Sequence, residues 1–388
     1  MLTRMVESGS VTTKAVLIGV IVLLLLVPLA MLRGVVTERA SLREQAHHRV
    51  AEGWGGALTF GGPILIVPIE RNLIAEDNKI RVVRTDMYVL PSRLDVDVEA
   101  KIDPQPRYVG IYGVPVYLSS FRTRGEFDIS VLQAQYDAPG VTFAWGESRL
   151  LLPVSSVKSL REVTQSEFAG QRVNFGPAGS RVYPGVEAPI DLSELHKAGT
   201  AAFDFGAVVA GSRNVSMLPL GGVTTVHLAS NWPHPSFQGA FLPVERNIAQ
   251  QGFDARWQVL ELNRSYRQVS SEGELNEAIL SQSSFGVDLF QSVDIYQRAE
   301  RAVKYAALFI ALTFLTLFAW EQVTRNRLHP LQYLLVGLAL SMFYLLLIAL
   351  SEHVAFDHAY LAAATACVAL VVAYLRHPLG TRLRAAAF

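Results

Sequence analysis

The stretch LQYLLVGLALSMFYLLLIALS, residues 331–351, contains no charged residue and ends directly before Glu352. In a helix that rises about 1.5 Å per residue it reaches roughly 30 Å, which is the thickness of the hydrocarbon core of a bilayer. The rest of the chain fits this pattern, because 51% of its 388 residues are apolar and its mean hydropathy is +0.28. The stretch therefore predicts a membrane-spanning helix.

Three further apolar runs predict additional spans at Ala15–Leu32, Tyr305–Trp320 and Ala359–Leu375. The first is longer than the apolar region of most signal peptides, and no A-x-A cleavage pattern follows it. We therefore expect an uncleaved anchor there. The last two runs are short for a span, but aromatic residues at their edges and snorkelling of Lys304 and Arg376 can extend them.

The charges of the short loops predict the orientation of these spans. Residues 321–330 and the tail 376–388 contain arginines and should be cytoplasmic, whereas residues 352–358 contain only acidic charges and should face outward. The arginines after the first span oppose this orientation, but short loops carry more weight than long exported segments. Both termini are then cytoplasmic, and residues 33–304 are periplasmic.

The predicted organisation has four parts: 1–32, the cytoplasmic N-terminus with the first span; 33–304, the periplasmic domain; 305–375, three transmembrane helices; and 376–388, a basic cytoplasmic tail. The periplasmic part begins with a polar helix over Val35–Val50, which alternates Glu and Arg and contains no Gly or Pro.

Farther along the periplasmic part, apolar and polar residues alternate with a period of two, most clearly in LDVDVEAKI, residues 94–102. Strict alternation places the charged residues on the wet face of a strand and the apolar residues on a core. An apolar run at 63–69 precedes the alternating part, and runs similar to 94–102, separated by Gly, Pro, Asn and Asp, recur at 81–90, 108–121, 125–131, 141–145, 149–153, 201–209, 215–220, 223–228 and 255–262. They predict a β-rich domain, an antiparallel sandwich or barrel. Residues 265–284 should be a linker or a helical excursion.

Composition and motifs exclude several classes of function. The 34 basic and 34 acidic residues cancel, so no net positive charge favours nucleic acid. The single cysteine, Cys367, can form neither an intramolecular disulfide nor a thiolate metal site. No G-x-S-x-G, Walker, G-x-G-x-x-G or H-E-x-x-H motif is present. The sequence therefore predicts no enzyme of these kinds, no cofactor and no nucleic-acid partner.

The candidate recognition site is the loop SNWPHPSF, residues 230–237. Two prolines stiffen it, and Trp232 offers a large anchor surface for a partner. The alternative is a structural turn in which Trp232 and Phe237 cover the edge of the core. The loop residues of interest are Asn231, Trp232, Pro233, His234, Pro235 and Phe237.

Other side chains allow alternative functions. His227 and His234, with a nearby carboxylate, could serve a hydrolytic or metal-dependent enzyme. The outer loop 352–358 contains ligand types in Glu352, His353, Asp357 and His358, although a turn between two spans needs polar residues in any case. A transporter subunit would need a partner, because the cores of the four predicted spans contain no Asp, Glu, Lys, Arg or His.

Membrane contacts are predicted at two kinds of position. Arg325, Arg327, Arg382 and Arg384 can meet anionic lipid headgroups on the cytoplasmic side. Small residues four apart, Gly337 with Ser341 and Ala362 with Ala366, can let helices pack closely and would permit self-association.

Several long strings resemble one family in the same order along the chain: PLAMLRGVVTERA (28–40), YVGIY (108–112), SNWPHPSF (230–237), RLHPLQYLLVGLAL (327–340) and FYLLLIALSEH (343–353). They resemble the CreD family of bacterial inner-membrane proteins. The resemblance implies a role in cell envelope integrity, two-component control and colicin tolerance, with no known catalytic activity or cofactor. Members of the family usually continue through further hydrophobic segments beyond the position of Phe388.

We therefore expect a non-enzymatic inner-membrane protein that presents a periplasmic β domain to another envelope component. Its partners would be the lipid bilayer and that component. The enzyme and the transporter-associated subunit remain the alternative interpretations.

Overall fold

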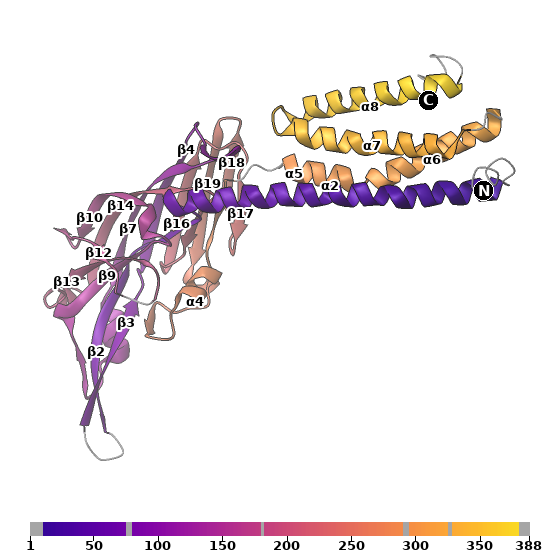
Figure 1. Cartoon of the computed structure of the whole chain (residues 1–388). Helices are drawn as coiled ribbons and strands as arrows, with labels where there is room; N and C mark the ends of the chain where they lie inside the picture. Colours follow the sequence, from indigo (N-terminus) through magenta and orange to yellow (C-terminus); the bar gives the residue numbers. More distant parts are fainter. Residues whose placement is uncertain (1–10, 75–79, 180–181, 290–294, 325–327, 380–388) are drawn as a thin grey trace. The chain divides into compact units, whose positions relative to one another are not determined.

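The computed structural model describes residues 11–74, 80–179, 182–289, 295–324 and 328–379 (Figure 1). The chain divides into two compact units. Met1–Glu44 and Ser292–Phe388 form a helical unit, and Gln45–Gln291 form a β-rich unit.

The helical unit contains the four predicted spans. Its helices are α2 (Val11–Gly53), α5 (Ile295–Lys304), α6 (Ala306–Thr324), α7 (Pro330–Ser351) and α8 (Phe356–Leu379). All but α5 are long and apolar enough to cross a membrane, counting α8 to Leu375. The predicted spans are confirmed as helices. The predicted polar helix at 35–50 is a direct continuation of the first span, since α2 runs unbroken from Val11 through Pro28 to Gly53.

Small residues bring the helices of this unit together. On α7, Gly337 lies so close to Leu25 of α2 and Phe314 of α6 that an added Cβ would be 2.1 Å and 2.8 Å from their side chains. Ser341 is also buried. On α8 the buried small residues are Ala359 and Ala363.

Within this chain Ala362 and Ala366 are exposed, so they do not pack α8 against α7, and self-association through them stays a prediction. Adjacent helix positions point about 100° apart, so a shift of one residue turns a different face toward α7. Alanine is so frequent in this segment that the sequence pattern could not distinguish the two faces.

The largest sheet of the β-rich unit has eight strands. In spatial order they are β11 (Gln171–Arg172), β10 (Leu160–Phe168), β14 (Thr200–Gly211), β7 (Tyr117–Asp128), β4 (Arg93–Ile102), β16 (Val223–Ser230), β19 (Gly252–Leu260) and β18 (Glu245–Ala249). Pairing is antiparallel except between β4 and β16. The alternation predicted for 94–102 is confirmed, because Leu94, Val96, Val98 and Ala100 are buried.

Among the described residues, two further large sheets and one two-stranded hairpin complete the domain. A seven-stranded sheet contains β12 (Gly176–Pro177), β13 (Gly185–Ile190), β9 (Ser148–Pro153), β2 (Ile64–Ile74), β3 (Ile80–Val89) and β20 (Val269–Ser271), with β8 (Val141–Phe143) paired to β2. A four-stranded sheet contains β1 (Leu58–Gly61), β15 (Asn214–Leu218), β21 (Phe285–Asp288) and β17 (Ser236–Gly239). Figure 1 shows β2 and β3 as one long hairpin.

The buried side chains of the three sheets form one continuous core. Phe60 of β1 stacks on Phe121 of β7 with ring centroids 4.4 Å apart, and Phe285 of β21 lies 5.7 Å from Trp257 of β19. These contacts join the four-stranded sheet to the eight-stranded sheet. Of the two predicted architectures, the packed sheets are the one observed, because the domain is not closed into a barrel.

Some predicted elements differ in detail. The run 108–121 is not one strand: it forms the hairpin β5 (Arg107–Val109) and β6 (Tyr112–Val114), followed by β7. Gly110, with φ +62°, makes the turn of this hairpin. The run 125–131 ends in the short helix α3 (Ser130–Tyr136). Residues 265–284 contain β20 and the helix α4 (Glu277–Gln282).

Candidate recognition site

The predicted recognition loop connects β16 of the eight-stranded sheet to β17 of the four-stranded sheet. Asn231 fixes its start. The Asn231 side chain accepts a hydrogen bond from the Ile102 N–H at 2.8 Å and donates one to the Ile102 carbonyl at 3.3 Å. One amide side chain therefore continues the sheet pairing at the end of β4, and it ties the loop to that strand.

The aromatic residues of the loop face inward. Trp232 is half-buried against the core, its N–H donates to the Ser230 hydroxyl at 3.2 Å, and its indole N–H donates to the His234 carbonyl at 3.0 Å. Phe237 packs edge-on against Phe253 and Trp257, with ring centroids 5.7 Å apart in both pairs. These two side chains hold the loop in place.

Among the rings of the loop, that of His234 is the exposed one; Asn231 and Ser236 are exposed as well. Pro233 and Pro235 on either side of His234 are half-buried. The contacts described for this loop involve the His234 carbonyl and leave its imidazole unused. The loop is therefore a rigid turn that displays one imidazole.

The sequence analysis did not select the tip of the β5–β6 hairpin as a site. Tyr108 is 68% exposed and Ile111 is 58% exposed, so two large apolar side chains flank Gly110 in solvent. The base of the hairpin is anchored, because the Arg107 guanidinium stacks 4.6 Å from the Trp54 ring centroid. The apolar residues around a turn glycine were the available signal.

His227, the residue considered for catalysis, lies on the polar face of the eight-stranded sheet. Its Nε2 is 2.5 Å from Asp254 Oδ2 on β19, and its Nδ1 is 3.7 Å from Asp97 Oδ1 on β4. The structure thus brings His227 beside carboxylates, as the enzyme alternative requires. None of its described contacts involves His234, and the described residues contain no cluster of three or more metal-ligating side chains.

The same face carries ion pairs between neighbouring strands. Arg122 of β7 binds Asp204 of β14 through both oxygens, with the Nε–Oδ1 contact at 2.8 Å, and Arg124 lies 3.6 Å from Asp97. The Arg122 guanidinium holds the pKa of the Asp204 carboxyl below its ordinary value. Opposite charges on adjacent strands compensate one another, so this face has little unbalanced charge where these pairs lie.

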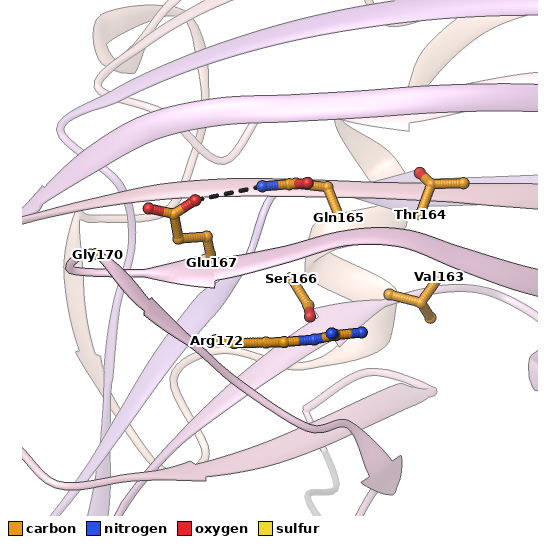
Figure 2. Close-up of a pocket in the computed structure, with 7 residues that line it drawn as sticks. All are labelled: Val163, Thr164, Gln165, Ser166, Glu167, Gly170 and Arg172. Atoms are coloured by element: carbon orange, nitrogen blue, oxygen red, sulfur yellow. Dashed lines mark hydrogen bonds between the residues drawn. The ribbon is translucent and has the colours of Figure 1, made fainter.

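A shallow groove of about 380 Å³ lies along the β10–β11 turn (Figure 2). It is lined by Val163, Thr164, Gln165, Ser166, Glu167, Gly170 and Arg172. The Gln165 amide donates to Glu167 Oε2 at 3.2 Å, and Figure 2 shows the Arg172 side chain extending beneath Ser166. These polar groups can form hydrogen bonds, but none of the predicted site residues lines the groove.

The outer loop of the helical unit does not gather its ligand types into a described metal site. Glu352 lies 3.6 Å from Arg39 of α2, and His353, Asp357 and His358 are exposed. The four arginines predicted to contact lipid headgroups, Arg325, Arg327, Arg382 and Arg384, lie outside the described residues.

A polar cluster in the helical unit was missed. Glu321, near the end of α6, is 4% exposed and forms an ion pair with Lys14 of α2. The predicted span Tyr305–Trp320 ends one residue before Glu321, so the sequence assigns Glu321 to the following loop. The signal was its spacing, because Glu321 follows the buried Leu317 by four residues.

Comparison with known proteins agrees with these features. The family described as "Inner membrane protein CreD" matches residues 10–388. The inner membrane protein CreD of Escherichia coli (strain K12) is 33% identical over 347 residues, which cover 88% of this chain and 76% of that protein. With its apolar helices and its β-rich domain, the chain belongs to the CreD family of inner membrane proteins.

Proposed function

We propose that the protein supports cell envelope integrity by presenting its β-rich unit in the periplasm, where the loop 230–237 binds another envelope component. The observation that carries this proposal is that the residues that hold the shape of the loop differ from the residue whose ring faces the solvent. Asn231, Trp232 and Phe237 hold its shape, and His234 is exposed. A loop that is already ordered loses little conformational entropy when it binds a partner.

Two ion pairs support the topology of this proposal. Lys14 pairs with Glu321 near the end of α6, and Arg39 lies 3.6 Å from Glu352 after the end of α7. The positive-inside rule assigns the α6–α7 connection to the cytoplasm, because it contains Arg325 and Arg327. The start of α2 then belongs to the cytoplasmic side, and the β-rich unit that follows α2 belongs to the periplasm.

The tip of the β5–β6 hairpin is a second contact surface in this proposal. An exposed tyrosine provides a large contact area at a low cost in conformational entropy, and Ile111 adds apolar surface beside it. A partner with an apolar pocket would fit the side chains of Tyr108 and Ile111.

Alanine substitution of His234 tests the role of the loop. Cells that carry H234A should release a periplasmic marker enzyme into the medium, as cells that lack the protein do. The abundance of the H234A protein in the membrane should stay at the wild-type level. His234 is exposed, and surface substitutions away from structural contacts usually change stability by less than about 0.5 kcal/mol.

Two control variants distinguish a loss of recognition from a loss of stability and from a general surface effect. The variant W232A should reduce abundance, because it removes a half-buried ring and its hydrogen bond to the His234 carbonyl. The variant R172A changes an exposed side chain in the groove and should leave the envelope intact. Marker retention by H234A would contradict the proposal. Stoichiometric zinc or manganese in the purified full-length protein would instead favour metal-dependent chemistry around His227.

A further inference from the structure

The buried face of α2 is a regular stripe that begins at a lysine. Its members recur every three or four residues, which places them on one side of the helix. They are Ile18, Ile21, Leu25, Leu29, Leu32 and Val36. Lys14 precedes Ile18 by four residues and therefore belongs to the same face.

The buried face of α6 is a matching stripe that ends at a glutamate. Its members are Ala306, Ile310, Phe314, Leu317 and Glu321. Burial of a carboxylate is costly unless the charge is paired and its oxygens are hydrogen-bonded. The 4% exposure of Glu321 therefore requires specific partners on the neighbouring segments.

Those partners come from α2 and α7. The Lys14 ammonium pairs with Glu321 Oε1 and donates to the Leu328 carbonyl at 2.8 Å. The Tyr333 hydroxyl of α7 donates to Glu321 Oε2 at 3.0 Å. Both carboxylate oxygens are thus engaged, and the lysine bridges α2 to the residues just before α7.

Apolar contact continues from this cluster along the helices. Leu25 of α2 and Phe314 of α6 close around Gly337 of α7. Farther along, Arg39 lies 3.6 Å from Glu352. The interval from Lys14 to Arg39 corresponds to roughly 38 Å of helix, which is close to the thickness of about 40 Å for a bilayer with its headgroup regions. The two ion pairs therefore bracket the apolar contact.

We propose that Lys14, Glu321 and Tyr333 form a polar clasp that locks α2 onto α6 and α7 and fixes its register. An apolar stripe with a repeat of three and four residues can slide along its partner with little loss of contact, whereas a buried polar group specifies one alignment. Sliding of α2 would leave Glu321 buried without its lysine, which is strongly destabilising. The N-terminal helix is thus part of the helical core.

A cleavable form of the full chain tests the clasp. A protease site is inserted between Gln291 and Ser292, the boundary of the two units, and the purified protein is cut in mild detergent. The fragment with α2 then stays with the fragment containing α5–α8 only through non-covalent contacts. Affinity capture of the first fragment, followed by quantification of the second, measures their dissociation.

The variants K14M, E321Q and K14M/E321Q form a double-mutant cycle. Each single variant should increase dissociation about tenfold, because it leaves one member of the ion pair without its charged partner. The double variant should dissociate less than the product of the two single effects, because neither charge remains. The variant R33M, which removes an exposed positive charge from the same helix, should behave like the wild type.

Two results would overturn the clasp: single variants that dissociate like the wild type, or a double variant whose effect equals the product of the single effects. If a single variant fails to accumulate, Y333F replaces it, since this change removes only the hydroxyl that donates to Glu321. Y333F should increase dissociation at least about twofold. Unchanged dissociation of Y333F would then also overturn the proposal.

Discussion

Asn231 performs at the end of β4 the role that a neighbouring strand performs elsewhere in the sheet, since its side-chain amide bonds to both backbone groups of Ile102. Trp232 and Phe237 likewise make their contacts within the protein, Trp232 by a hydrogen bond and Phe237 by ring packing. The residue types of this loop predicted a stiff turn that is either recognition surface or cover for the core. Which side chains would remain exposed depended on contacts with β4 and β19, which are distant in sequence.

The Arg122–Asp204 pair makes a prediction about acid stability. The pKa of Asp204 is lowered from its ordinary value of 3.8, chiefly by the hydrogen bond from Arg122. Because the pKa of Asp204 is lower in the folded state than in the unfolded state, the pair stabilises the fold at pH values above the ordinary pKa. This contribution is lost as the pH falls through the lowered pKa of the folded state. When the pH is lowered from 6 to 3, the Tm of the wild type should therefore fall more than the Tm of D204N.

The variant R122Q provides the control for this experiment. It removes the other member of the pair, so its pH profile should be as flat as that of D204N, and the double variant should resemble both. A D204N profile that keeps the full wild-type dependence between pH 6 and pH 3 would show that Asp204 titrates identically in the folded and unfolded states.

At the scale of elements, close approach at Gly337 makes a packing prediction. A Cβ at this position meets Leu25 and Phe314, so G337V should lower the stability of the helical unit by about 1–3 kcal/mol through overpacking. Thermal unfolding of the detergent-solubilised full chain measures the change. The matched control is G19A on α2, where an added Cβ meets no atom within 4 Å.

A compensating substitution separates packing from a general effect of valine at this position. The variant L25A/G337V removes the side chain that an added Cβ would strike first, so it should recover part of the stability lost in G337V. Failure of L25A to relieve G337V would contradict the contact between α2 and α7.

The elements differed in how far the sequence predicted them. The four spans and the alternating strand β4 were predictable, because their periodicity is a local property of the chain. The parallel pair of β4 with β16 and that of β1 with β15 join segments far apart in sequence, and no local pattern encodes that choice. The face that α8 turns toward α7 was unpredictable for a related reason, since alanines occupy several of its faces.

At the scale of the whole molecule, the chain consists of a helical unit with four candidate spans and a β-rich unit, and the helix α2 runs from the first unit into the second. Membership of the CreD family fits the inner-membrane assignment. The contact of Lys14 with Glu321 was not predicted from the sequence, because a charged residue at the end of an apolar run resembles an ordinary loop residue. Only the tertiary contact of Lys14 with Glu321 distinguishes the two cases.

The most direct test of the account is the side of the membrane on which the β-rich unit lies. Single cysteines are placed in the full chain with Cys367 changed to Ser, at three exposed positions: Leu262 in the β-rich unit, Val323 near the end of α6 and Val354 after α7. A membrane-impermeant maleimide is then applied to cells whose inner membrane is intact. The account predicts labelling of Leu262→Cys and Val354→Cys, and labelling of Val323→Cys only after lysis. Labelling of Val323→Cys in intact cells, with Leu262→Cys protected, would contradict it.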